Sequence, residues 1–153
     1  MNPNKCVFGV PLGQLLGFLV SHRGIEASAK QIRAITEMGP LRSVKDVQKL
    51  TGYMAALNRF ISRLGEKGLP FFKLLKKTDK FEWIEEANEA FKRLKAYLTS
   101  SSVLIPPKKY EDMMLYIVAT STVISTAIVV EREEGHVYKV QCPVYYINEV
   151  LLE

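Results

Sequence analysis

The sequence predicts an α+β fold in which strands occupy both ends of the chain and helices occupy the middle. Three observations support this class. Alternating apolar residues begin the chain, apolar residues then recur at helical spacing over residues 29–98, and β-branched residues dominate the run after residue 112. We therefore expect an N-terminal β-hairpin, three to four helices and a C-terminal antiparallel three-stranded sheet.

The N-terminal hairpin is expected within residues 1–28. Residues 5–10 alternate as one strand, and residues 14–21 form the second. Between them, residues 10–13 (Val-Pro-Leu-Gly) suit a type I turn, because proline is favoured at the second turn position and glycine at the fourth. After a turn at residues 22–24, Ile25 and Glu26 can pair again.

Four helical segments are expected between the two sets of strands, at residues 29–38, 43–65, 68–77 and 85–97. The longest begins at Ser43, a favourable N-cap, and ends at Gly65. Its apolar residues recur at steps of three and four and form one stripe over about six turns. The stripe comprises Val44, Val47, Leu50, Met54, Leu57, Ile61 and Leu64.

The opposite face of this long helix carries a second stripe, with cations at its ends and very small residues in its middle. It comprises Lys45, Lys49, Gly52, Ala56, Arg59 and Arg63, and Gln48 adjoins it. Small residues let another backbone approach closely, and flanking cations can neutralise phosphates. Such a face can follow the wide minor groove of an A-like duplex and read its shape. Alternatively, it is a solvated face on which Gly52 and Ala56 pack against a neighbouring helix.

The charge of the chain is unevenly distributed. The formal net charge is +5, but residues 1–100 hold 17 Lys and Arg against 9 Asp and Glu, a net of +8. Residues 101–153 hold 4 against 7, a net of −3. The basic part indicates nucleic acid or an acidic surface as partner. A further cluster is either solvated or a phosphate contact: Lys73, Lys76, Lys77 and Lys80.

The uncharged run of residues 113–130 reaches the lower limit of transmembrane length. Ser and Thr residues interrupt its middle, and most of its apolar residues are β-branched, which favours sheet strands. The sequence therefore predicts strands at residues 113–120, 123–131 and 137–146, and a turn at residues 133–136. We expect no membrane partner.

Residues that carry out catalysis in other proteins are few here. The sequence has no clustered carboxylate set of the kind that holds two metal ions. His22 and His136 lie in expected turns, without a Cys or acidic partner at ligand spacing. Cys6 and Cys142 fit strand positions as small apolar side chains. We expect no catalytic residue, no metal site and no cofactor in this chain.

Several motifs resemble those of the gypsy-type reverse transcriptases of LTR retrotransposons. Residues 2–8 (Asn-Pro-Asn-Lys-Cys-Val-Phe) resemble the family's Leu-Asn-Pro-x-Lys-Cys-x-Phe, and residues 16–25 resemble its Leu-Gly-[Phe/His]-x-Val-Ser-x-x-Gly-Ile. Gly52 and residues 59–61 (Arg-Phe-Ile) match the thumb motif Leu-Gly-x-x-x-x-Tyr-Arg-x-Phe-Ile. Further matches follow in order at residues 74–77, 81–83, 90–95 and 98–100. Plant elements whose first RNase H-like domain has decayed are the most similar.

The resemblance implies four parts. Residues 1–28 correspond to the end of the palm, residues 29–77 to the thumb helices, residues 78–110 to a connecting helix and linker, and residues 111–153 to a truncated RNase H-like domain. In the thumb, Gln48, Gly52 and Ala56 fall on positions that track the duplex minor groove. In the palm end, the hairpin that grips the primer terminus corresponds to Leu16, Gly17, Phe18 and Leu19.

The resemblance also implies that neither catalytic centre of the parent enzyme is complete here. The Tyr-x-Asp-Asp turn of the polymerase lies upstream of residue 1, and Val118 occupies the position of the first metal-binding Asp of RNase H. A valine cannot ligate the Mg²⁺ that the parent family uses. We therefore expect a non-catalytic piece of a polyprotein that holds an RNA/DNA or DNA template–primer duplex beside the rest of the polyprotein. The expected location is a cytoplasmic virus-like particle or the nucleus.

The alternative function is a structural or protein-interaction module. The thumb helices would then act as a scaffold and the decayed sheet as a tether, in a host-recruited protein or a pseudogene product. Three RNase H-like strands without their helices leave an apolar sheet face uncovered and a strand edge open. We therefore expect partial folding, association or poor solubility of residues 111–153.

Overall fold

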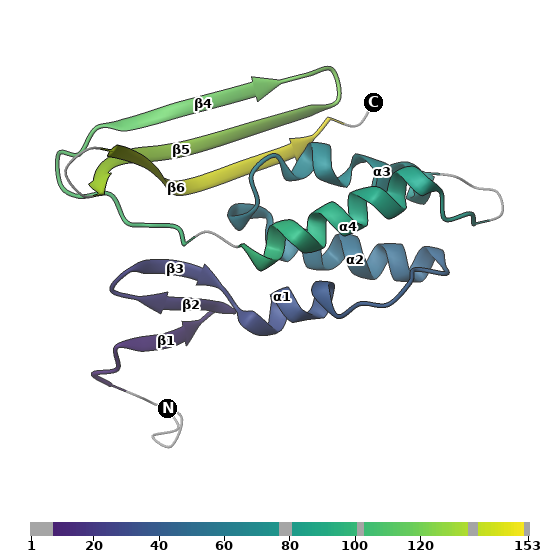
Figure 1. The fold of residues 1–153 in the computed structure, drawn as a ribbon, viewed down its shortest axis with the longest axis horizontal. Helices are drawn as coiled ribbons and strands as arrows, with labels where there is room; N and C mark the ends of the chain where they lie inside the picture. The colour runs from purple at the N-terminus through teal and green to yellow at the C-terminus, as the bar shows by residue number, and fades with distance from the viewer. Residues whose placement is uncertain (1–7, 77–80, 101–102, 135–137, 152–153) are drawn as a thin grey trace.

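A computed structural model of the chain describes residues 8–76, 81–100, 103–134 and 138–151. It contains two three-stranded antiparallel sheets and four α-helices between them in sequence, which confirms the predicted class and element order. Figure 1 shows the N-terminal sheet at one end of the helical layer and the C-terminal sheet alongside it, with its last strand nearest the helices.

The N-terminal sheet consists of β1 (Leu12–Leu15), β2 (Phe18–Ser21) and β3 (Gly24–Ala27), paired in that order. The predicted turn at residues 10–13 is wrong, and residues 8–10 lie outside any strand. The chain turns instead at Leu16 and Gly17, whose φ angles are 50° and 83°. Two positive φ angles give a two-residue turn whose twist matches that of the strands. The expected pairing of residues 25 and 26 is confirmed, while residues 5–7 of the predicted first strand lie outside the described residues.

The helices are α1 (Ala29–Thr36), α2 (Val44–Ala56), α3 (Leu64–Lys76) and α4 (Glu85–Thr99), with a 3₁₀ turn η2 (Asn58–Phe60) between α2 and α3. The first and last helices confirm their predictions to within a few residues. The predicted continuous helix over residues 43–65 is wrong, because α2 ends at Ala56 and the chain is extended at Ile61. Gly65, the predicted helix end, lies inside α3, which also contains most of the predicted helix at residues 68–77.

The interruption between α2 and α3 is stabilised by Asn148, far along the chain. Its side-chain amide donates to the carbonyl oxygens of Asn58 and Ile61 at 3.1 and 2.9 Å, and its Oδ1 accepts from the N–H of Leu64 at 2.9 Å. These bonds satisfy backbone groups that helix termini leave without intrahelical partners. A helix break that depends on a residue so distant leaves no signal in the local periodicity.

The C-terminal sheet consists of β4 (Met113–Ala119), β5 (Val123–Glu134) and β6 (Tyr138–Val150) in that order, so the three predicted strands are confirmed. The second and third are longer than predicted. Glu133 and Glu134, expected in a turn, belong to β5, and Gly135 and His136 lie outside the described residues. A register shift between Ile128 and Val129 accommodates a bulge against β6.

The hydrophobic core lies among the four helices, and the predicted apolar stripe supplies much of it despite the helix break. Six of its seven members are buried: Val47, Leu50, Met54, Leu57, Ile61 and Leu64. Phe71 stacks near Trp83 and meets the edge of Phe91. The N-terminal sheet joins this core through Phe18, whose ring centroid lies 5.5 Å from that of Phe60.

Two glycines permit close contacts between the layers. A Cβ on Gly24 would lie 2.1 Å from the carbonyl oxygen of Leu104, beside the paired backbone of Ile25 and Leu104. A Cβ on Gly65 would lie 3.1 Å from the side chain of Val123, where α3 packs on β5. These positions hold the two sheets against the connecting segment and the helices.

The outer strand of the C-terminal sheet is largely uncovered, as expected from the sequence. Met113, Leu115 and Ile117 on one face of β4 are 56, 60 and 62% exposed, and Tyr116 and Val118 on the other face are 46 and 43% exposed. The free edge of β4 has no partner strand within the described part of the chain. The predicted effect on solubility stays a prediction.

Candidate nucleic-acid interface

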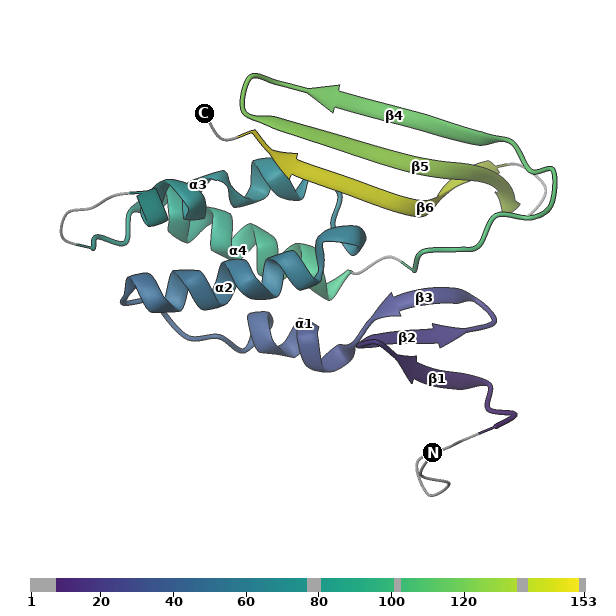
Figure 2. The same cartoon turned by 180° about the vertical axis from the view of Figure 1, so that it is seen from behind.

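The first candidate surface is the exposed face of α2. We call it the α2 face and define it by Lys45, Gln48, Lys49, Gly52 and Ala56, all of which are exposed. Figure 2 shows α2 at the front of the helical layer, with no other element crossing it. Neither lysine forms an ion pair with another described residue. The face therefore presents two free cations and a nearly flat helix surface.

The start of α2 is fixed by a reciprocal cap. The N–H of Asp46 donates to Oγ of Ser43 at 3.2 Å, and Oδ2 of Asp46 accepts from Oγ of Ser43 at 2.8 Å. The N–H of Arg42 also donates to Oδ2, and this bond is the largest cause of the lowered pKa of the Asp46 carboxyl. The ionised carboxylate favours the helix N-terminus, so the orientation of the first turn, which carries Lys45, is well defined.

Gly52 lies at the centre of the α2 face and contacts nothing there. A Cβ built on Gly52 would meet no atom within 4 Å. The alternative in which Gly52 packs against a neighbouring helix is therefore wrong for the described structure. A glycine in a helix interior destabilises the helix by roughly 0.5–1 kcal/mol relative to alanine, and no intramolecular contact here accounts for that cost.

A groove runs beside the α2 face, between α2, α3 and the end of β6. Its volume is about 570 Å³. Gln48, Thr51 and Gly52 line its α2 side, and Phe72 and Val150 lie across from them. The groove leaves Gly52 and its neighbours accessible from the side as well as from the front.

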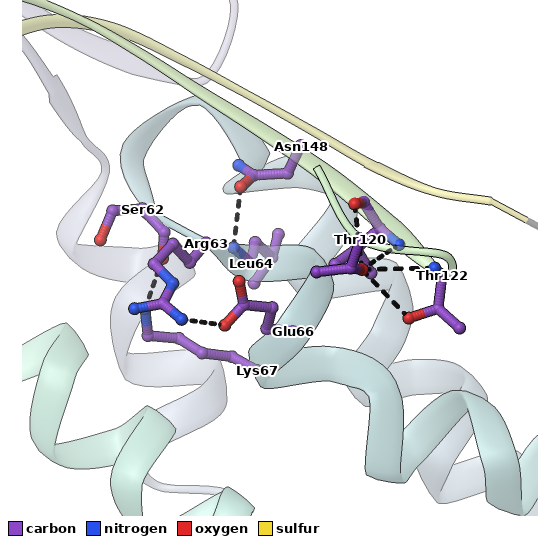
Figure 3. Close-up of polar contacts among 9 residues, drawn as sticks. Ser62, Arg63, Leu64, Glu66, Lys67, Thr120, Thr122 and Asn148 are labelled. Atoms are coloured by element: carbon purple, nitrogen blue, oxygen red, sulfur yellow. Dashed lines mark hydrogen bonds and ion pairs between the residues drawn. The ribbon is translucent and has the colours of Figure 1, made fainter. Parts of the chain in front are cut away.

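Arg59 and Arg63 do not belong to the α2 face, so the predicted six-residue stripe on one helix is wrong. Arg59 lies in η2, and Arg63 has a φ of 53° immediately before α3. Figure 3 shows the guanidinium of Arg63 directed toward the carboxylate of Glu66, with which it forms an ion pair. Because α2 ends at Ala56, neither arginine continues the α2 face.

Lys67 adds a partly buried cation beside this ion pair. Its ammonium donates to the carbonyl oxygen of Ser62 and lies 4.6 Å from the ring centroid of Tyr97. Burial lowers the pKa of Lys67, and the charge of Arg63 lowers it further. This lysine is engaged by Ser62 and Tyr97 and is less available to an external ligand than Lys45 and Lys49 are.

The residues predicted to grip the primer divide between the turn and the core. Leu16 is 87% exposed at the tip of the β1–β2 turn, beside Gly17. Phe18 packs against the core, and Leu19 is half-buried in β2 opposite Gln14. Of the four, Leu16 is the residue most available to a ligand.

The second basic cluster is only partly free. Lys73 forms an exposed ion pair with Glu86 at 3.3 Å, and Lys76 is exposed in the last turn of α3. Lys77 and Lys80 lie outside the described residues. Cys6 and His136 lie outside them as well.

The Mg²⁺ that the family resemblance implies does not fit the residues present on β4. Val118 is paired with Ser125 of β5 and offers no oxygen ligand, and β4 carries no acidic side chain. Among the described residues, no three His, Cys, Asp or Glu side chains come together at a spacing that could hold a metal ion. The helices in the described ranges are too short or too polar to cross a membrane.

Two features of the site were missed by sequence reasoning. The guanidinium of Arg59 lies 4.7 Å from the ring centroid of Phe18 and 5.7 Å from that of Tyr145. The amide of Asn148 organises the chain reversal between α2 and α3. Both depend on contacts between distant segments, and nothing in the local pattern indicates them.

Curated proteins of similar sequence include one plant mitochondrial protein and two transposon polyproteins. The chain is 31% identical over 108 residues to an uncharacterized mitochondrial protein of Arabidopsis thaliana, covering 69% of this chain and 68% of that protein. It is 28% identical over 149 residues to the retrovirus-related Pol polyprotein from transposon opus, and 24% identical over 148 residues to that from transposon 412, both of Drosophila melanogaster. These alignments cover 90 and 97% of this chain but only 14 and 12% of the polyproteins. No family model matches the chain.

Solved structures share the fold. The foamy viral protease-reverse transcriptase in complex with an RNA/DNA hybrid matches 93% of this chain with a TM-score of 0.71 at 16% identity, over 19% of its own length. The same enzyme in complex with dsDNA matches 92% of this chain with a TM-score of 0.70, over 29% of its own length. The fold is therefore that of a segment of a reverse transcriptase. The chain is a homologue of the Arabidopsis mitochondrial protein and of retrovirus-related Pol polyproteins from transposons.

Proposed function

We propose that this chain is the part of a retrotransposon reverse transcriptase that holds the template–primer duplex, and that the α2 face is the holding surface. The observation that carries the proposal is the open Gly52 at the centre of the α2 face, with Lys45 and Lys49 exposed beside it. A duplex backbone can approach α2 closely at Gly52 and Ala56, while the lysines neutralise neighbouring phosphates. The foamy viral enzyme of similar fold was solved with an RNA/DNA hybrid and with dsDNA, which supports a duplex as the ligand.

A binding titration tests this proposal. The full chain is titrated against a labelled RNA/DNA hybrid at about 50 and 200 mM salt, alone and with Lys45→Glu and Lys49→Glu combined. Because phosphate contacts release counterions, we expect weaker binding at the higher salt and a large loss of affinity in the double variant. The matched control changes Lys92 and Arg93, which are exposed on α4, to Glu. Equal losses in both double variants, or no salt dependence, would sink the proposal.

We also propose that the chain has no RNase H activity of its own, since Val118 replaces the acidic ligand that the family resemblance implies at this position of β4. Incubation of the chain with an end-labelled hybrid in Mg²⁺ tests this. Release of labelled fragments would overturn it.

A protein-interaction module is the second candidate, and the exposed apolar β4 favours it. Met113, Leu115 and Ile117 form an uncharged row beside a free strand edge, a surface suited to a partner protein. Under this function, replacing Leu115 by Glu would abolish association with the partner and leave duplex binding unchanged. The first candidate is favoured if the duplex binds through the α2 face and β4 variants do not change association of the chain with a partner protein.

A further inference from the structure

Arg59 occupies a junction between the two sheets. It lies in η2, two residues beyond Leu57, the C-cap of α2, and its guanidinium lies over Phe18 of β2 and Tyr145 of β6. A cation over an aromatic ring is stabilised by the ring electrons, so these contacts fix where the guanidinium lies. The residue thereby touches both the hairpin strand and the C-terminal sheet.

The hydrogen-bonding capacity of Arg59 is not used by the fold. A guanidinium carries five N–H donors, and aromatic rings do not supply oxygen acceptors to them. No hydrogen bond or ion pair joins the Arg59 side chain to any other residue that the structure describes. Arg63 and Arg132, by contrast, each pair with a carboxylate, Glu66 and Glu111. Arg59 is half-buried, and its nitrogens are not among the described buried polar atoms that lack a partner, so its donors remain accessible to water or to a ligand.

A groove of about 370 Å³ opens beside Arg59. Its walls come from β2–β3, the connecting segment and β6, and Arg59 is the one charged residue among its described lining. Apolar groups make up most of the remaining walls, notably Ile25, Pro106 and Pro107, and Ser21 and Tyr145 add hydroxyl groups. Its volume lies in the range of small-ligand sites, roughly 300–1,000 Å³, and is sufficient for one nucleotide unit.

We propose that this groove, which we call the Arg59 groove, binds a phosphate group of a nucleic-acid strand through the Arg59 guanidinium. The planar fork of a guanidinium matches the oxygens of a phosphate, and the ring contacts have already fixed its position. The apolar walls suit the sugar and base that flank the phosphate. The proposal rests on the proposed function, because it takes the phosphate from a nucleic-acid strand.

The position of the groove favours a nucleic-acid strand over a free anion. η2 follows α2 after Leu57, and Figure 2 shows the N-terminal sheet beyond the C-terminal end of α2, while the C-terminal sheet lies alongside the helices and extends past this end. A strand that follows the α2 face from Lys45 toward Ala56 therefore runs toward η2, the element that carries Arg59. Lys108 and Lys109 follow Pro107 and are exposed, and Lys108 shares its surroundings with Glu111 and Arg132.

The experiment uses the full chain and measures affinity for a labelled RNA/DNA hybrid with a single-stranded extension. The variants are Arg59→Gln, Arg59→Lys and Ile25→Glu. Ile25→Glu keeps Arg59 and its ring contacts but places a carboxylate in the groove, so it blocks the site without removing the residue. The matched control is Arg63→Gln, which removes an equally cationic side chain that already has a carboxylate partner. Thermal melts accompany each variant.

We expect Arg59→Gln and Ile25→Glu each to weaken binding about three- to tenfold and to reduce the log–log salt slope by about one phosphate contact, with Arg59→Lys intermediate and Arg63→Gln unchanged. Unchanged affinity in Ile25→Glu, or equal losses in Arg59→Gln and Arg63→Gln, would overturn the proposal. Failure of the α2 face is distinguishable, because the Lys45/Lys49 variant would then bind as the parent does while Ile25→Glu still loses affinity.

Two further probes separate the sources of the anion. Inorganic phosphate or a poly-glutamate peptide is added to the parent and to Arg59→Gln, and the melting temperature is followed. If phosphate raises the melting temperature only when Arg59 is present, and hybrid affinity does not depend on Arg59, the groove binds a free anion. That result overturns the proposal that the phosphate comes from a nucleic-acid strand. The same pattern with the peptide assigns the groove to an acidic protein and also overturns the proposal.

Discussion

The side chains of Asn58 and Asn148 are hydrogen-bonded to each other across 90 residues of sequence. Nδ2 of Asn148 donates to Oδ1 of Asn58 at 3.0 Å, and Nδ2 of Asn58 donates to the carbonyl oxygen of Asn148 at 3.3 Å. The same Asn148 amide binds Ile61 and Leu64, as Figure 3 shows in part. The pair therefore joins β6 to the segment between α2 and α3, and it sets the direction in which α3 leaves.

Replacing Asn148 by Ala is expected to destabilise the fold by about 2–4 kcal/mol. The change leaves the Leu64 N–H and the Ile61 carbonyl oxygen without partners in a half-buried place, and the Asn58 carbonyl oxygen keeps only the N–H of Ile61. Each unmet buried group costs roughly 1–3 kcal/mol before water compensates. Urea unfolding followed by circular dichroism measures the effect. The control is Asn88→Ala, since Asn88 bonds only to the exposed Glu85 among the described side chains. Similar losses in both variants would show that Asn148 has no special role.

The break between α2 and α3 also explains which features of the fold could be predicted from the sequence and which could not. The apolar stripe from Val47 to Leu64 correctly identified core residues, because burial follows the same spacing on both sides of the break. The direction of Arg59 and Arg63 could not be predicted, because it depends on hydrogen bonds from Asn148, which lies in β6 of the C-terminal sheet. Helices α1 and α4 have caps or apolar faces within their own sequence, and their predicted positions are confirmed.

In the N-terminal sheet, the position of the first turn was predicted wrongly, and the cause is local. Residues 10–13 have the composition of a type I turn, whereas the actual turn places a leucine at φ 50°, a position that favours glycine or asparagine. A bulky residue in this conformation is rare, so composition misplaced the turn. An exposed, strained Leu16 is consistent with a residue retained for contact with a ligand.

Replacing Leu16 by Asn should stabilise the chain by about 0.5–1 kcal/mol, because asparagine adopts positive φ more readily than leucine. If the hairpin contacts the duplex, the same variant binds the hybrid more weakly although it is more stable. Thermal unfolding and hybrid titration together measure both effects. Leu12→Asn is the control, since Leu12 is exposed on β1 without a positive φ and should give no gain in stability. Unchanged hybrid affinity in the Leu16 variant would argue against a primer-gripping role.

Glu111 should make stability depend on acid pH. Hydrogen bonds from Arg132, the largest cause, and from the Lys108 N–H lower the pKa of Glu111 from 4.5 to about 2. The unfolded chain therefore takes up a proton near pH 4.5 while the folded chain remains ionised. The stabilisation from Glu111 is complete above that pH and is lost as pH falls toward about 2.

A pH series tests this effect. Unfolding free energies of the parent and of Glu111→Gln are compared from about pH 6 down to about pH 2, and the difference between them should shrink as the pH falls. Glu133→Gln serves as the control, because no hydrogen bond of the Glu133 side chain to another described residue is present. A difference that stays constant over the whole pH range would show that the Arg132 contact does not hold Glu111 ionised.

Substitutions of Gly52 are expected to raise the stability of α2 and, where the new side chain is large, to weaken hybrid binding. Gly52→Ala should stabilise α2 by about 1 kcal/mol, because alanine is the better helix former and a Cβ meets no atom there. Gly52→Leu should keep most of that stability and yet weaken hybrid binding about tenfold or more, since the side chain projects from the α2 face into the path of the duplex. The control is Ala96→Leu, which adds similar bulk at an exposed position of α4. If Gly52→Leu binds the hybrid as tightly as the control does, the close approach of a duplex to α2 is wrong.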